Sequence, residues 1–112
     1  MVLYLVQRHR TQSQSRILKL KSITANYKNR VDFKVGDIIQ WKEGLKNKMF
    51  PEYNEPAIIL EILDEPLVDT DDRIGSPYYK EQLDLKLGMI DDDGDLVSFY
   101  FDGNRFEFYK EN

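Results

Sequence analysis

The chain has 112 residues, of which 41% are hydrophobic and 32% are charged, and its formal net charge at neutral pH is −4. These totals are typical of one small globular domain and exclude a chain dominated by disorder. The absence of cysteine excludes disulfides, thiolate nucleophiles and cysteine-ligated zinc.

The charge is distributed unevenly along the chain. Residues 1–50 carry eleven Lys and Arg and three acidic residues, a net charge of +8, whereas residues 51–112 carry five basic and seventeen acidic residues, a net charge of −12. Such a split fits a nucleic-acid patch, head-to-tail packing of two copies, or attraction between the two halves within one fold. We favour the last arrangement, in which the two halves compensate each other.

The N-terminal segment, residues 1–32, is expected to differ from the rest of the chain. Residues 1–6 are apolar but too short to span a bilayer, and their position ahead of the basic residues does not fit a signal peptide. We therefore expect a cytoplasmic protein with no membrane contact. Residues 1–6 would add a strand, pack on a helix, or pair with a second copy as a homodimer. Residues 7–16 lack apolar periodicity, which predicts a basic arm.

Residues 16–31 are predicted to form an amphipathic helix. Apolar residues recur there at steps of three and four, which places them on one helical face, and Ser15 is a suitable N-cap. The predicted apolar face consists of Ile17, Leu20, Ile23, Tyr27 and Val31.

Strand patterns and turn signals alternate over the second segment, residues 33–112. Asp93-Gly94 is the signature of a tight hairpin turn, and the connections at 42–55 and 64–82 are long. Five strands with a closing meander predict a small antiparallel barrel. The predicted strands are 38–41, 57–63, 83–90, 96–101 and 105–109.

The phrase FKVGDIIQW at 33–41 resembles the first strand of SH3-like barrels, and the closing meander is similar to the rest of such a barrel. The resemblance covers about 33–110. It implies a mainly β fold, namely a five-stranded SH3-like antiparallel barrel with an N-terminal amphipathic α-helix. Proline-rich peptide binding is not implied, because the ALYDY phrase is absent and 64–82 is longer than usual. The chain also resembles short uncharacterised bacterial or phage proteins, and this likeness implies no activity.

Catalytic chemistry finds little support in the sequence. His9 is the only histidine and lies in the predicted arm, where no scaffold places it beside a nucleophile. The acidic runs at 64–72 and 91–95 lack the apolar surroundings that a general acid needs, and 91–95 does not match the ligand spacing of a calcium loop. We expect no catalytic residue, no metal site and no cofactor.

A metal-dependent nuclease remains a third hypothesis. Asp84 and Lys86 alternate on one strand and are preceded by Asp71 and Asp72, as in sites that hold Mg²⁺ and a water molecule. Such a triplet also arises by chance on any alternating strand.

Nucleic-acid binding is the main alternative function. Basic residues of the first half would contact phosphates, and Trp41, Phe50 and Tyr53 would stack on bases. A pI near 5.0 argues against this hypothesis. The candidate basic residues are Arg8, Arg10, Lys19, Lys21, Lys42, Lys46 and Lys48.

A protein-interaction surface is the favoured hypothesis. Many aromatic residues lie in the two long connections, which flank one face in an SH3-like barrel, and such rings form interface cores or cover a small core. The chain would then be a non-enzymatic interaction module, as a subunit or an inhibitor in a bacterial or phage-encoded system. The predicted partner-binding residues are Trp41, Met49, Phe50, Tyr53, Tyr78 and Tyr79.

Overall fold

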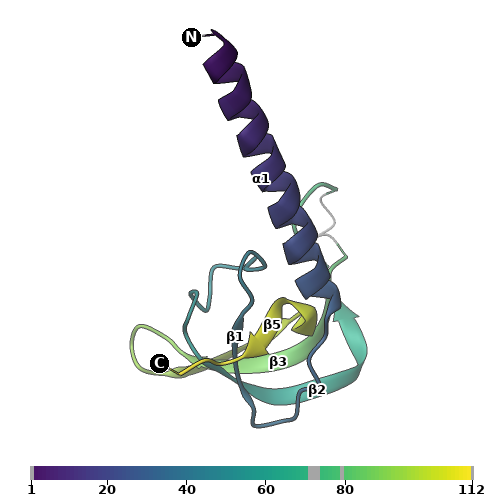
Figure 1. Ribbon diagram of the computed structural model, residues 1–112. Coiled ribbons are helices and arrows are strands. Elements are labelled where there is room, and N and C mark those ends of the chain that lie inside the picture. Colours follow the sequence, from purple (N-terminus) through teal and green to yellow (C-terminus); the bar gives the residue numbers. More distant parts are fainter. Residues whose placement is uncertain (1, 71–73, 79, 112) are drawn as a thin grey trace.

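The computed structural model describes residues 2–70, 74–78 and 80–111, with the side chains of the first helix described from Ser13 onward. A long helix, α1, rises from one end of an antiparallel sheet (Figure 1). The elements are α1 (Val2–Lys28), β1 (Ile38–Trp41), β2 (Ala57–Val68), β3 (Gln82–Ile90), β4 (Leu96–Phe101), the 3₁₀ helix η1 (Gly103–Arg105) and β5 (Phe106–Phe108).

The five strands form one sheet in the order β4-β3-β2-β1-β5, and every pairing is antiparallel. This confirms the prediction of a mainly β fold with five antiparallel strands and an N-terminal helix. The pairings leave β4 and β5 as the two edges, so the sheet is open among the described residues. Closure into a barrel is not confirmed.

Strand β2 is the longest strand and connects the two parts of the sheet. Ile58 and Ala57 pair with β1, while the strand pairs with β3 from Ile58 to Val68. The register shifts between Ile59 and Glu61, and again between Ile62 and Leu67. Pro66 lies in the second shift, as expected for a residue that cannot donate to a ladder. The predicted strand 57–63 therefore continues for five more residues.

The core lies on one face of the sheet because alternate strand residues point to that face. Trp41 stacks on Phe106 with ring centroids 4.2 Å apart, and Phe101 meets both rings edge-on. Aliphatic side chains of the central strands complete this cluster of buried residues: Ile39, Ala57, Ile59, Leu85, Leu87 and Met89.

Helix α1 differs from its prediction at both ends. It runs continuously from Val2 to Lys28, so the prediction of an arm at 7–16 is wrong, and the predicted helix 16–31 ends three residues early. Within the described side chains, only Ile23 and Tyr27 of the predicted apolar face are half-buried in α1, whereas Ile17 and Leu20 are exposed. Among the described side chains of α1, burial is therefore confined to the last two turns of the helix.

Three polar side chains fix the C-terminal end of α1. The Lys42 ammonium donates to the carbonyl oxygens of Asn26, in the last turn of the helix, and of Asn29, directly after it. The Tyr27 hydroxyl donates to Asp102 at 2.7 Å, and Arg30 forms an ion pair with Asp84 at 2.6 Å. The expected compensation between the basic and acidic halves is thus seen at the base of α1, beside η1 and the start of β3.

Candidate functional site

The loop between β1 and β2, residues 42–56, is held firmly at its base. The indole nitrogen of Trp41 donates to the carbonyl oxygen of Pro51 at 2.6 Å. The carboxylate of Glu81 accepts from the Asn47 amide at 3.0 and 3.1 Å and pairs with Lys48 at 3.1 Å. These contacts fix the loop backbone on either side of residues 49 and 50.

The middle of this loop presents apolar side chains to solvent. The exposed fractions are 72% for Met49, 50% for Phe50 and 44% for Tyr53. The described part of the connection between β2 and β3 leaves all three accessible. The backbone beneath these side chains is already fixed. A partner that bound to them would therefore cause little further loss of conformational entropy in the loop.

A groove of about 440 Å³ runs between this loop and the hairpin of β3 and β4. Its apolar lining includes Phe50, Met89, Val97 and Phe99. Acidic residues of the loop and of the hairpin turn line it as well: Glu52, Glu55, Asp91, Asp92 and Asp93. The groove is therefore an apolar channel with an acidic rim.

A second groove, of about 370 Å³, lies on the other side of Phe50 and Phe99, and Met49 and Leu83 line it. Phe50 and Phe99 belong to both grooves, so the two form one continuous apolar region. We call this region the Phe50–Phe99 surface and define it by the side chains Met49, Phe50, Met89, Val97 and Phe99.

The other predicted partner-binding residues lie elsewhere. Trp41 is 2% exposed within the core, so it supports the loop and does not itself reach a surface. Tyr78 is half-buried, with the Lys48 ammonium 4.5 Å from its ring centroid. Tyr79 lies outside the described residues. The structure thus brings Met49 and Phe50 into one surface and separates Trp41 from it.

Those predicted nucleic-acid residues whose side chains the structure describes do not form one patch. Lys42 is 5% exposed and is engaged with the end of α1, and burial lowers the pKa of its ammonium. Lys48 is paired with Glu81, and Lys46 is half-buried. Lys19 and Lys21 are exposed on α1, whereas the side chains of Arg8 and Arg10 lie outside the described part.

A polar cleft of about 500 Å³ lies where the end of α1 meets η1 and the start of β3. Burial, followed by the hydrogen bond to Asp102, raises the pKa of Tyr27 above its usual value of 10.0. Arg105 lies 3.2 Å from Glu81 and donates to the carbonyl oxygen of Leu45 at 3.1 Å. The carboxylates here have cationic or hydroxyl partners, which indicates a structural ion-pair network.

The nuclease hypothesis gains no geometric support from the described residues. Asp84 uses one carboxylate oxygen for Arg30 and the other for the backbone N–H of Gly103, at 2.8 Å. The ammonium of Lys86 lies 5.9 Å from the ring centroid of Tyr100. Asp71 and Asp72 lie outside the described residues.

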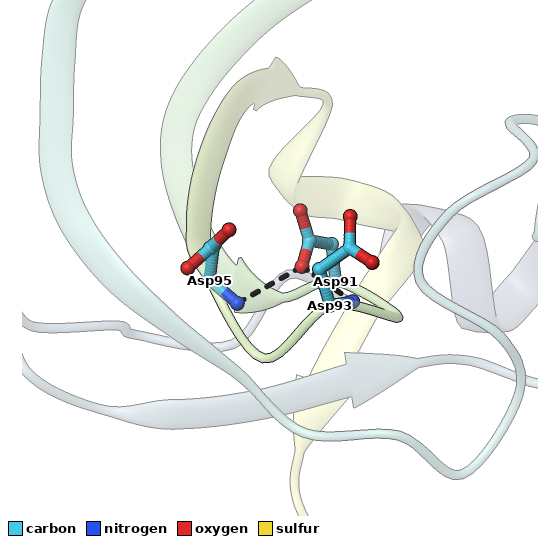
Figure 2. A group of neighbouring side chains, drawn as sticks. All are labelled: Asp91, Asp93 and Asp95. Carbon is cyan, nitrogen blue, oxygen red and sulfur yellow. Dashed lines mark hydrogen bonds between the residues drawn. The ribbon is translucent and has the colours of Figure 1, made fainter.

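Figure 2 shows three carboxyl groups at the turn between β3 and β4. Single oxygens of Asp91, Asp93 and Asp95 lie within 4.8 Å of one another. One oxygen of Asp91 accepts from the backbone N–H of Asp93 at 3.0 Å and of Asp95 at 2.9 Å. Asp91 therefore stabilises the hairpin turn, in agreement with the interpretation of 91–95 as a turn.

Phe99 is the important residue that sequence reasoning missed. Phe99 pairs with Leu87 and so lies on the core face, where alternation along 96–101 predicts burial. It is nevertheless 52% exposed, because β4 is an edge strand and no further strand covers it. Only the strand order, which the local sequence does not contain, reveals this exposure.

Comparison with protein-family models, with curated proteins and with solved structures finds no match to this chain. In the described part of the chain, no helix combines the length and apolar character needed to cross a bilayer. Functional inference therefore depends on the geometry above.

Proposed function

We propose that this chain is a non-enzymatic protein-binding module whose contact site is the Phe50–Phe99 surface. The observation that carries the proposal is the exposure of Met49, Phe50 and Phe99 side by side on a fixed backbone. Contiguous apolar side chains with a charged rim are typical of protein interfaces. A role as a subunit or as an inhibitor in a bacterial or phage-encoded system fits such a module.

The scaffold of this module is proposed to be an SH3-like barrel. The long strand β2 joins β1 and β5 on one side to β3 and β4 on the other, and its register shifts allow it to bend. This topology, together with the FKVGDIIQW phrase, supports the resemblance at the level of the fold.

Affinity capture with matched variants tests the protein-binding function. Tagged wild type should capture a partner from a lysate of its native host, and Met49→Ser with Phe99→Thr should lose that partner while remaining folded. Val35→Thr is the control, since Val35 is exposed and does not line either groove. Equal capture by all three proteins would reject the proposed surface.

Nucleic-acid binding stays a prediction and is the alternative. The exposed cations of α1 support it, whereas the engagement of Lys42 and Lys48 with protein groups weakens it. A phosphate-contacting helix would bind a DNA duplex at low salt and lose affinity steeply as salt is added. Absence of binding at low salt would remove this alternative.

A further inference from the structure

The exposed part of α1 is a basic helix with an apolar stripe. Ile17 and Leu20 are three residues apart and so share one face, flanked by Arg16 and Lys21. Both apolar side chains are more than half exposed. The chain has no acidic residue before Asp32, so nothing on α1 itself neutralises these cations.

The groove beside Phe50 has the complementary chemistry. Its lining combines the apolar side chains of the Phe50–Phe99 surface with five carboxylates, and the groove contains no Lys or Arg among the residues that line it. An apolar channel with an acidic rim fits a helix that carries an apolar stripe between basic side chains.

We propose that this groove receives helix α1 of a second copy of the same chain. Ile17 and Leu20 would pack on Phe50 and Phe99, while the cations of α1 would face the carboxylates of the rim. The inference rests on the proposed protein-binding function and names the partner. It also accounts for the cations of α1 that take no part in the described ion pairs between the two halves, which join Arg30 to Asp84 and Lys48 to Glu81.

The helix of the same copy cannot occupy its own groove. Arg30 ties the end of α1 to Asp84 near the start of β3, whereas the groove lies at the turn after β3. The seven residues from Asp84 to Asp91 span about 23 Å of extended strand. Figure 1 shows α1 leaving the sheet at one end, with the turn between β3 and β4 at the other.

Pairing of two α1 helices is disfavoured by their charge. Cations on both helices would face each other without an intervening acid, and like charges across a helix interface are destabilising. The proposed contact joins two different surfaces and is therefore heterologous. Each copy offers one helix and one groove, so the assembly grows head to tail until it closes into a ring or continues as a filament.

Two variants of the full chain test this arrangement by sedimentation velocity. The helix variant is Ile17→Gln with Leu20→Gln, and the groove variant is Phe99→Thr. All three positions are exposed, so these changes leave the core intact. Wild type should show a mass that rises with concentration beyond that of a dimer, and raising NaCl from about 0.05 M to about 0.5 M should weaken association by about tenfold or more.

Each variant alone should be a monomer, because it lacks one of the two complementary surfaces. An equimolar mixture should give a dimer and nothing larger, since the intact groove of the helix variant binds the intact helix of the groove variant. Leu18→Gln, on a different face of α1, is the control and should associate like wild type. A mixture that stays monomeric, or a single variant that still associates, would overturn the proposal.

A monomeric wild type at all concentrations would also overturn the self-association while leaving the protein-binding function separately testable by capture. In that case, binding of a DNA duplex that is lost in Arg16→Gln, Lys19→Gln and Lys21→Gln would assign α1 to nucleic acid instead. Loss of capture by the Phe99→Thr variant without any self-association would show that the surface binds a different protein.

Discussion

The ammonium group of Lys42 lies 3.0 Å from the carbonyl oxygen of Asn29 and also donates to that of Asn26. Lys42 directly follows β1, and Asn26 is in the last turn of α1. One buried side chain thus connects the sheet to the end of the helix and provides a donor for the carbonyl oxygens there. This contact helps to position α1.

Replacement of Lys42 by Met is expected to lower the free energy of unfolding by about 1–3 kcal/mol, because two part-buried hydrogen bonds from its charged ammonium are lost. Urea unfolding followed by the fluorescence of Trp41, the single tryptophan, measures this change. Lys34→Met, at an exposed turn, is the control and should be close to neutral. Equal losses for the two variants would contradict the role of Lys42.

Tyr27→Phe should lower stability by about 1–2 kcal/mol at neutral pH, because the hydrogen bond to Asp102 is lost. Burial and this hydrogen bond raise the pKa of Tyr27, so the folded state keeps the phenol proton to a higher pH than the unfolded state. The contribution of Tyr27 is therefore complete below pH 10.0 and is lost as pH rises through the raised folded pKa.

The difference between wild type and Tyr27→Phe should accordingly shrink above about pH 10 in unfolding experiments over a pH series. Tyr109→Phe, which removes a hydroxyl that forms no hydrogen bond among the described residues, is the control at neutral pH. A difference that stayed constant well above the usual tyrosine pKa would argue against the Asp102 contact.

Gly44→Ala should cost more than Gly36→Ala. Both glycines have positive φ, +78° and +94°, so both substitutions strain the backbone by about 1 kcal/mol or more. A Cβ at Gly44 would in addition overlap Cδ1 of Ile23, whereas a Cβ at Gly36 meets nothing within 4 Å. Because Cδ1 is the far end of a flexible side chain that can move aside, equilibrium unfolding should place Gly44→Ala about 0.5–1 kcal/mol below Gly36→Ala.

A double-mutant cycle isolates the contact with the helix. In an Ile23→Ala background, the cost of Gly44→Ala should fall to that of Gly36→Ala, because the overlapping atom is gone. Unchanged costs in that background would mean that α1 does not pack on the loop at Gly44.

Glu81→Ala should destabilise the fold by about 1–3 kcal/mol, since it removes the carboxylate partner of the half-buried Lys48 and one of the two carboxylate partners of Arg105. Glu81 contacts Asn47, Lys48 and Arg105, so its loss should also loosen the loop. Faster amide hydrogen exchange at residues 45–50 would report this change. Glu65→Ala, at an exposed position, is the control, and equal exchange in both variants would contradict the prediction.

The strands were the most predictable part of the fold. The range 96–101 was predicted as found, and 83–90 was one residue short, because alternation and the Asp-Gly turn are local signals. The strand at 57–63 was too short, since the prediction followed the apolar, isoleucine-rich run and the strand continues beyond it to Val68. The structure places Pro66 at a register shift, where a missing donor is tolerated.

Helix α1 was predicted only in part, for a physical reason. Residues 7–16 show no apolar periodicity, and the side chains described in that stretch, from Ser13 to Arg16, are exposed. The stretch nevertheless has Gln and Arg, which favour helix, and the chain has no Gly or Pro before Gly36. Apolar periodicity indicates which residues are buried, whereas the absence of Gly and Pro indicates that the backbone can form a helix.

The candidate surface shows the same division between local and tertiary information. Met49 and Phe50 were predicted as surface residues from their loop. Trp41 was included with them, yet its ring packs on Phe101 and Phe106, which are distant in sequence. Phe99 was omitted because its exposure follows from the edge position of β4.

The length of α1 has a geometric consequence. Its 27 residues correspond to about 40 Å, and its half-buried residues, Ile23 and Tyr27, lie near one end. Deleting four residues between Ser13 and Ile23 would shorten this rod by about 6 Å and rotate its far end by about 40°. Deleting seven would shorten it by about 10 Å with only about 20° of rotation. The length of helix α1 can therefore be changed with little change in the direction that the side chains at its far end face.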